Sequence, residues 1–224
     1  MQGVSTICMM KSENGIWTAP SEIALSLKLD DFRDPAISAD GKKMYFLSKG
    51  KFAYQSEAKE NIWFVERTKS GWSEPQPLNK EINSHALHWQ VSVASNGNLY
   101  FTSRNTGHED IYCSKYINGN YQKPEKLHSN VNTENFCETT PYIAPDESYL
   151  IFSRWNFFDQ DGGMHLYISF RNNGGGWRSA QKLIGEARCP QVSIDGKYLF
   201  YLDWRKSIPF WVSAKIIEDL RPKE

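Results

Sequence analysis

Short apolar runs alternate with polar turns along the chain, and a four-part pattern of such runs returns about every 50 residues. The first two parts are apolar runs on either side of a tight turn: PAISADGKKMYFLS, VSVASNGNLYFTS, PYIAPDESYLIFS and PQVSIDGKYLFYL. Asp-Gly and Asn-Gly pairs predict β-hairpins with positive φ at both turn positions. Asp146-Glu147 lacks the glycine and predicts a longer or more strained turn. Each segment is therefore expected to form two antiparallel strands.

The last two parts of the pattern predict a third and a fourth strand. The third-strand segments are NIWFVE, DIYCSK, HLYISF and PFWVSA. The fourth part starts at an aromatic residue, and the aromatic residues in register are Trp17, Trp72, Tyr121 and Trp177. Pro75 and Pro124 cannot donate a ladder hydrogen bond, which places them on an edge strand. We expect the aromatic residue and the leucine that follows it to pack between neighbouring units, with proline at the outer rim.

A four-stranded unit repeated in this way predicts an all-β fold, a β-propeller of four-stranded antiparallel blades. A β-sandwich would show frequent turns without a longer period of about 50 residues. The whole chain, 1–224, is expected to be a single domain. Its predicted parts are a partial blade at 3–26, complete blades at 31–84, 87–133 and 137–185, and a C-terminal blade at 188–220. Helix is nearly absent, and SAKIIEDLRP is expected to be the last strand or a short helical turn.

The number of blades has two interpretations. The favoured one is a five-bladed type with an incomplete first blade, because residues 3–26 match only the third and fourth strands of a unit. In the other, the N-terminal strands close a ring of four blades together with the C-terminal strands. A ring left unclosed would expose a strand edge, which favours association.

The stretches PAISADGKKMYFLSKG, ENIWFVERTKSGWSEPQPLNKEINS and TPYIAPDESYLIFS resemble the WD40-like β-propeller repeat family, the TolB-type propellers of bacteria. The resemblance covers almost the whole chain. It implies a propeller fold and, since members of the family are often exported and act as binding scaffolds, some with cell-envelope proteins, a periplasmic or secreted bacterial protein. These properties are implied by likeness alone.

Composition and charge narrow the class of partner. Lys+Arg and Asp+Glu both number 26, so the formal net charge is zero, which argues against a nucleic-acid partner. No stretch has the roughly 20 apolar residues of a membrane span. The start of the chain lacks a leader pattern, so we expect a cytoplasmic protein or one whose leader has been removed. The four cysteines have no C-x-x-C spacing; free, mostly buried thiols and no metal or cofactor are expected for Cys8, Cys113, Cys137 and Cys189.

Propellers bind at one face, around the central channel, so the residues just before each inner strand are candidate ligand contacts. In this chain these residues are polar and differ from unit to unit. Those expected to bind a protein or carbohydrate partner are Arg33, His88, Trp89, Glu138 and Arg188. The alternative is that these side chains hydrate the channel and pair with one another.

The same positions also allow a catalytic interpretation. His88, Glu138 and Asp34 supply the acid, the base and the orienting carboxylate of hydrolase chemistry, and paired carboxylates serve glycosidases. No G-x-S-x-G elbow is present. We therefore expect a non-enzymatic binding scaffold, with a propeller hydrolase or lyase that uses carboxylates at the channel mouth as the alternative.

The segment SRWNFFDQDGGMH, residues 153 to 165, places aromatic side chains in an expected loop. Trp155, Phe157 and Phe158 are costly to expose, so they either fold back on the next blade or bind sugar rings or a protein surface. Asp159 and Asp161 echo the start of a calcium loop, but the closing Glu of an EF-hand is missing. The loop is therefore a second candidate binding surface rather than a metal site.

Overall fold

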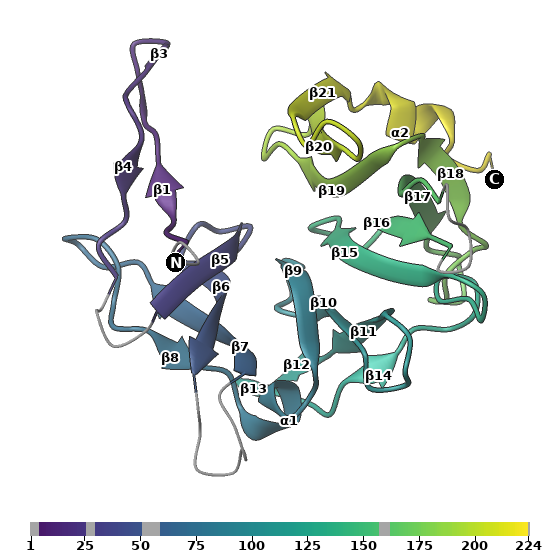
Figure 1. Cartoon of the computed structure of the whole chain (residues 1–224), viewed down its shortest axis with the longest axis horizontal. Coiled ribbons are helices and arrows are strands. Elements are labelled where there is room, and N and C mark those ends of the chain that lie inside the picture. Colours follow the sequence, from purple (N-terminus) through teal and green to yellow (C-terminus); the bar gives the residue numbers. More distant parts are fainter. Residues whose placement is uncertain (1–4, 26–29, 51–58, 157–161, 224) are drawn as a thin grey trace.

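The repeated segments form antiparallel sheets around a common axis in the computed structural model, which describes residues 5–25, 30–50, 59–156 and 162–223 (Figure 1). The first blade holds β5 (Asp30–Ile37), β6 (Lys43–Gly50), β7 (Lys59–Glu66) and β8 (Gln76–Pro77). The second holds β9 (Leu87–Val93), β10 (Leu99–Ser103), β11 (Asp110–Ser114) and β14 (Glu125–Lys126). The third holds β15 (Cys137–Ile143), β16 (Tyr149–Trp155), β17 (His165–Phe170) and β18 (Gln181–Ile184). The fourth holds β19 (Ala187–Val192), β20 (Tyr198–Asp203) and β21 (Pro209–Ser213). The chain is therefore an all-β propeller, as predicted.

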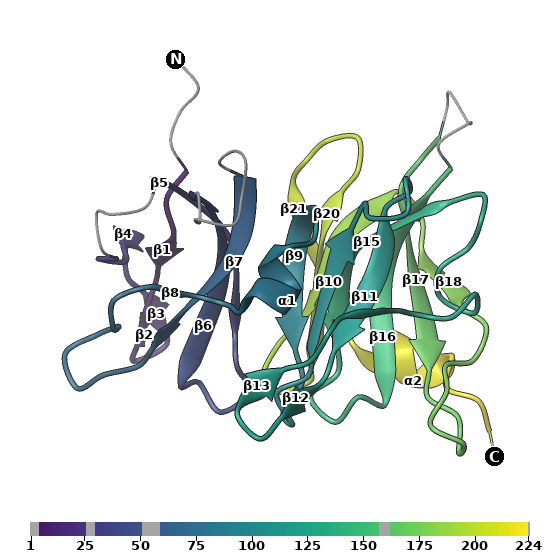
Figure 2. The same ribbon diagram turned by 90° about the horizontal axis from the view of Figure 1, so that it is seen from below.

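The remaining elements are short. Two-stranded pairs are formed by β1 (Cys8–Met9) with β4 (Ser21–Glu22), by β2 (Ser12–Glu13) with β3 (Ile16–Trp17), and by β12 (Tyr116–Ile117) with β13 (Asn120–Tyr121). The helices are α1 (Lys80–Asn83), which lies between β7 and β9, and α2 (Lys215–Asp219) (Figure 2). The C-terminal segment is thus a short helix, one of the two predicted forms. In the described ranges, neither helix has the length or apolar character needed to cross a bilayer.

The N-terminal strands pack on the outside of the first blade. Ile7 is buried in one cluster with Met44 and Phe46 of β6. Within the described residues, β1 and β4 pair with each other and with no strand of the fourth blade. Four blades are present, but the ring closure by shared strands that one interpretation assumed is not among these pairings. A fifth blade completed by further strands stays a prediction.

The four hairpins between the first and second strands of the blades share one turn geometry. Gly41 donates its backbone N–H to Ser38 O at 2.8 Å and has a φ of 69°. Asp40 does not share this positive φ; its carboxylate instead accepts hydrogen bonds from Ser38 Oγ at 2.7 Å and from Lys42 N at 3.0 Å. The prediction of positive φ at both turn positions is therefore wrong, because the aspartate side chain stabilises the first half of the turn and only glycine is left-handed.

The third-blade turn places a glutamate where the other turns have glycine. Glu147 has a φ of 59°, and its N–H donates to Ala144 O at 2.8 Å, so this turn keeps the length of the others. Its carboxylate accepts hydrogen bonds from Tyr100 OH at 2.5 Å and from Asn96 Nδ2 at 2.8 Å, both in the second blade. The predicted strain at this turn is confirmed, and contacts with the neighbouring blade offset it.

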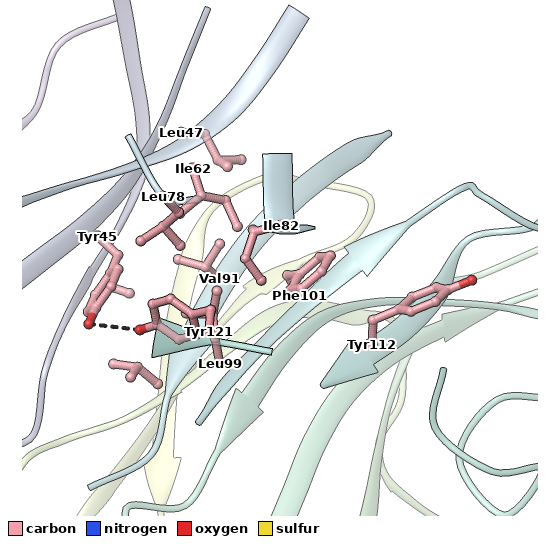
Figure 3. Packing of buried hydrophobic residues seen from close by; sticks show 12 residues of the cluster. Tyr45, Leu47, Ile62, Leu78, Ile82, Val91, Leu99, Phe101, Tyr112 and Tyr121 are labelled. Carbon is pink, nitrogen blue, oxygen red and sulfur yellow. Dashed lines mark hydrogen bonds between the residues drawn. The ribbon is translucent and has the colours of Figure 1, made fainter. Parts of the chain in front are cut away.

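Neighbouring blades pack through side chains that alternate along the second strand of each blade. In β6, Tyr45 and Leu47 face the second blade, whereas Met44 and Phe46 face the N-terminal strands. Figure 3 shows the interface between the first and second blades, where Tyr121 OH donates a hydrogen bond to Tyr45 OH at 3.0 Å. Period-2 alternation therefore gives every blade two apolar faces, one for each neighbour.

The recurring aromatic residue packs against the preceding blade, and the recurring leucine packs towards the following one. Trp177 of the third blade meets Tyr100 of the second edge to face, with ring centroids 6.4 Å apart. Leu78 of the first blade is buried in the same cluster as Val91 and Leu99 of the second. The predicted packing between units is confirmed for Trp177 and Leu78, but it is wrong for Trp17, which is 65% exposed.

A buried asparagine fixes the third strand in two of the blades. Asn83 Oδ1 accepts the N–H of Ile62 at 2.8 Å, and its Nδ2 donates to Ile62 O at 3.1 Å and Leu78 O at 3.0 Å. Asn132 makes the same three contacts in the second blade, with Ile111 and Leu127. Each amide therefore replaces ladder hydrogen bonds where the short fourth strand ends.

Candidate functional site

Each inner strand has a bulge near its middle, and these four bulges lie side by side around the axis. The register of every inner strand with its neighbour shifts at this point. The residues at the bulges have left-handed backbone conformations with φ between 48° and 56°: Asp34, Trp89, Thr140 and Cys189. Non-glycine residues adopt this conformation at a cost, and such strain concentrates at functional sites. Three of these residues, Trp89, Thr140 and Cys189, line a common cavity.

Hydrogen bonds join the bulges across the axis. Gln90 of the second blade donates its Nε2 to Pro190 O of the fourth blade at 3.0 Å. Cys189 N donates to Ser153 Oγ of the third blade at 3.3 Å, and Ser153 Oγ lies 2.6 Å from Thr140 Oγ1. The channel interior is thus partly closed by polar groups that hydrogen-bond to one another.

Two ionisable groups at the bulges have pKa values shifted by burial. Burial raises the pKa of the Cys189 thiol to about 11, so the thiol is protonated at neutral pH. Burial also raises the pKa of the Asp34 carboxyl, although a hydrogen bond with the Gln90 backbone and the charge of Arg33 oppose the shift. A protonated thiol is a poor nucleophile and a poor metal ligand. Among the described residues no cluster of three His, Cys, Asp or Glu side chains is suited to hold a metal ion.

A cavity of about 290 Å³ opens beside the bulges, and we call it the mouth cavity. Blades two, three and four each contribute one indole ring: Trp89 from β9, Trp155 at the end of β16 and Trp204 just after β20. The other residues that line it are Arg104, Glu109, Thr139, Thr140, Gly162, Met164, Arg188 and Cys189. Trp89 is 49% exposed, so its ring is available to a ligand. The cavity combines flat apolar walls with a few charged groups, the usual make-up of a ligand site.

The charged groups of the mouth cavity are held in fixed positions. Arg104 donates to Glu109 Oε1 from Nε at 3.0 Å and from Nη2 at 2.6 Å, and Trp155 Nε1 lies 3.4 Å from Glu109 Oε2. The guanidinium of Arg188 lies 5.5 Å from the ring centre of Trp204. Its Nη2 donates to Ser207 Oγ at 3.2 Å. These contacts order both arginines and both rings before any ligand arrives.

Arg33 and Trp89 also line a second cavity, of about 470 Å³, between the N-terminal strands and the first blade. The Nη2 of Arg33 lies 2.7 Å from Asp31 Oδ2 and 2.6 Å from Glu60 Oε1. Two carboxylates therefore neutralise this guanidinium. Arg33 thus shares this second cavity with Trp89, but it does not line the mouth cavity.

Glu138 is placed in the protein interior, outside the residues that line the mouth cavity. Its Oε1 accepts hydrogen bonds from Arg154 Nε at 2.8 Å and from Thr133 Oγ1 at 2.8 Å. Burial raises the pKa of this carboxyl to about 7, against the opposing effect of Thr133 and Arg154. Arg154 also lies over the Tyr167 ring, 4.4 Å from its centre. The pair acts as a buried link between strands β15 and β16.

The other candidates fall partly or wholly outside what the structure describes. The backbone of His88 pairs with Thr102 in the second blade, but its side chain is not described. Phe157 and Phe158 lie outside the described residues, as do Asp159 and Asp161. Their proposed binding roles therefore stay predictions.

Sequence reasoning missed Arg104, Glu109 and Trp204. All three follow the second strand of a blade, in the loops that correspond to residues 153–165 of the third blade. Aligning that loop across the repeat would have placed Trp155 beside them, because equivalent loops of a propeller lie at the same face.

The chain was compared with known proteins. No protein-family model matches it, and no curated protein sequence matches it. Among solved structures, TolB from Acinetobacter baumannii is similar, with a TM-score of 0.59 and 13% identity over 94% of this chain and 48% of that one. The endo-arabinase from Bacteroides thetaiotaomicron has a TM-score of 0.57 and 14% identity over 88% and 81% of the two chains. A protein from Lactobacillus plantarum has a TM-score of 0.54 and 11% identity over 93% and 60%.

The chain therefore spans about half the length of the TolB chain it matches. At these identities the likeness concerns the fold alone, and all three comparisons support the propeller architecture.

Proposed function

We propose that the chain is a non-enzymatic binding scaffold that recognises a protein or glycan partner at its mouth cavity. The observation that carries the proposal is the convergence of Trp89, Trp155 and Trp204 from three blades on one small cavity that two arginines flank. Tryptophan and arginine are the residue types that dominate binding energy at protein interfaces. Flat indole faces beside hydrogen-bonding groups also suit a sugar ring.

The size of the cavity limits what enters it. A volume of about 290 Å³ accommodates one large side chain or one sugar ring and not a whole drug-sized molecule. The partner would therefore insert one flat group between the rings, while the rest of its surface lies over the exposed edge of Trp89. A protein partner is favoured, because fixed Trp and Arg side chains around a small pocket are the usual anchor site for a single inserted residue.

The carboxylates support binding over hydrolysis. Glu109 is the one acidic side chain among the described residues that line the mouth cavity, and Arg104 holds it as an ion pair at 2.6 Å. Glu138, one of the two carboxyls that the sequence offered for catalysis, is buried against Arg154, and the second, Asp34, does not line this cavity. A two-carboxylate mechanism needs both groups facing the same bond of the substrate. A propeller hydrolase or lyase is thus the less supported alternative.

We further propose that the protein belongs to the WD40-like propellers of the TolB type and acts as one module in the bacterial periplasm or exterior. The sequence motifs and the structural similarity to TolB support this proposal. TolB-like propellers fit a protein partner, in agreement with the make-up of the mouth cavity.

The binding proposal can be tested by screening the wild-type chain against a phage-displayed peptide library and an array of bacterial surface glycans. Intrinsic tryptophan fluorescence would then measure the affinity of each selected ligand. We expect Trp204→Ala and Arg188→Ala to weaken binding by about tenfold or more, since truncated anchor residues commonly cost 2 kcal/mol or more.

The controls are Ile117→Ala and Arg178→Ala, which remove an exposed apolar side chain and an exposed arginine away from the mouth cavity. Both controls are expected to bind as the wild type does. Equal loss of affinity in controls and cavity variants, or no loss in either, would reject the mouth cavity as the binding site. Release of cleaved product from any array glycan would favour the enzymatic alternative.

A further inference from the structure

Aromatic surface is exposed at the two ends of the arc of blades, where Figure 1 shows β3 and β21. At the C-terminal end Trp211 is 61% and Phe200 43% exposed, and these residues pair across β20 and β21. The ring centre of Tyr198 lies 5.0 Å from that of Trp211, so the three rings share one face of the fourth blade. At the N-terminal end Ile16 is 75% and Trp17 65% exposed. Contiguous exposed aromatic groups of this kind mark interaction surfaces.

Phe200 stands at a position that is buried in the preceding blades. In the first, second and fourth blades, the last residue of the inner strand pairs with Met44, Leu99 and Leu199 of the second strand, respectively. The next residue of the second strand is Tyr45 in β6, Tyr100 in β10 and Phe200 in β20. Tyr45 and Tyr100 are 5% and 0% exposed, because each faces the following blade. The fourth blade therefore presents the same face without a blade against it in the described structure.

Trp17 stands at the complementary position of a blade. It pairs with Ser12 across a short hairpin, just as Tyr121 pairs with Tyr116 and Trp177 with Arg171. Tyr121 and Trp177 are buried against the preceding blade, where they contact Tyr45 and Tyr100 respectively. Trp17 therefore corresponds to the aromatic residue that contacts the preceding blade, Tyr121 in the second blade and Trp177 in the third.

We infer that a second copy of this chain covers these surfaces, with Phe200 and Trp211 of one copy packed against Trp17 of the other. The two contacts inside the chain, Tyr45 with Tyr121 and Tyr100 with Trp177, serve as the template. One chain carries both halves of that contact at its opposite ends, so copies are complementary to each other. The formal net charge of zero means that two copies do not repel each other at long range. Beside the aromatic face, the outer edge of β21 pairs with no other strand among the described residues.

Sedimentation velocity of the full chain tests the inference. The wild type is expected to sediment as a dimer or a larger assembly, in a concentration-dependent equilibrium. Trp17→Ser alone, and Phe200→Ser with Trp211→Ser, should each weaken self-association by about tenfold or more, since buried aromatic anchors dominate such interfaces. Circular dichroism should show an unchanged fold, because all three side chains are exposed. The matched control is Ile117→Ser, an exposed apolar residue away from both ends, which should associate as the wild type does.

Mixing the two variants tests whether the C-terminal face of one copy packs against the N-terminal surface of the other, rather than like surfaces packing together. The Trp17→Ser variant keeps its C-terminal face, and the Phe200→Ser, Trp211→Ser variant keeps its N-terminal surface, so the mixture should form heterodimers that neither variant forms alone. A monomeric wild type would overturn the inference and leave these surfaces to a sheet from another protein. A Trp17→Ser variant that dimerises as the wild type does would overturn it in favour of contact between two C-terminal faces.

Discussion

Replacing Asn83 with alanine should destabilise the propeller more than its small change in volume suggests. The side chain is fully buried and makes three hydrogen bonds to backbone groups, at 2.8, 3.0 and 3.1 Å. The substitution leaves the N–H of Ile62 and the C=O of Leu78 without this partner, whereas the C=O of Ile62 keeps the N–H of Leu78 at 3.0 Å. A buried polar group that loses its partner costs about 1–3 kcal/mol. Allowing for partial relaxation, we expect Asn83→Ala to lower the free energy of unfolding by about 3–5 kcal/mol.

Urea denaturation followed by tryptophan fluorescence and circular dichroism measures this loss. Asn132→Ala removes the same three contacts in the second blade and should cost a similar amount. Asn135→Ala, at an exposed position, is the control and should change stability by less than about 0.5 kcal/mol. A loss below about 1 kcal/mol for Asn83→Ala would refute the reasoning, because it would mean that the amide does not hold the third strand.

Two further substitutions test the electrostatics and the turns. The folded-state pKa of Glu138, about 7, lies above its ordinary value of 4.5, so the folded protein holds an extra proton between these pH values and stability falls as pH rises through this window. Glu138→Gln should remove this fall in the free energy of unfolding, which we expect to be about 1–3 kcal/mol in the wild type. Urea denaturation at pH 4.5 and 7.5 measures it, and the same pH dependence in both proteins would contradict the prediction. Gly97→Ala should destabilise by about 1–2 kcal/mol more than Gly41→Ala, because a Cβ on Gly97 would meet Tyr116 Cδ1 at 2.7 Å while one on Gly41 meets nothing within 4 Å. Equal melting temperatures of the two variants would refute this packing.

Local patterns in the sequence predicted the strands and their turns well. The repeated Asp-Gly and Asn-Gly pairs mark hairpins because glycine adopts the left-handed conformation without strain, as at Gly41 and Gly97. The recurring aromatic residue predicts blade packing because its bulk must be buried, and Tyr121 and Trp177 are buried between blades. These features depend on a few adjacent residues and on the repeat, so they are visible without a structure.

The candidate site was less predictable because it depends on register and on loops. Glu138 was proposed as a ligand contact, but Thr139 and Thr140, one and two residues further on, line the mouth cavity. A shift of one residue reverses the direction of a side chain in a strand, and the bulge at Thr140 adds another change of direction. Trp204 and Arg104 come from loops of different blades, so their proximity follows from the assembled ring and not from any local pattern.

Hydrogen–deuterium exchange of the wild-type chain, with and without the tightest ligand from the peptide and glycan screens, tests the binding proposal most directly. We expect slower exchange at the backbone amides beside the mouth cavity, in residues 88–90, 103–110, 138–140, 188–191 and 203–207. The outer strands β8, β14 and β18 should exchange as in the free protein. Protection confined to those outer strands, with no change around Trp89 and Trp204, would contradict the account.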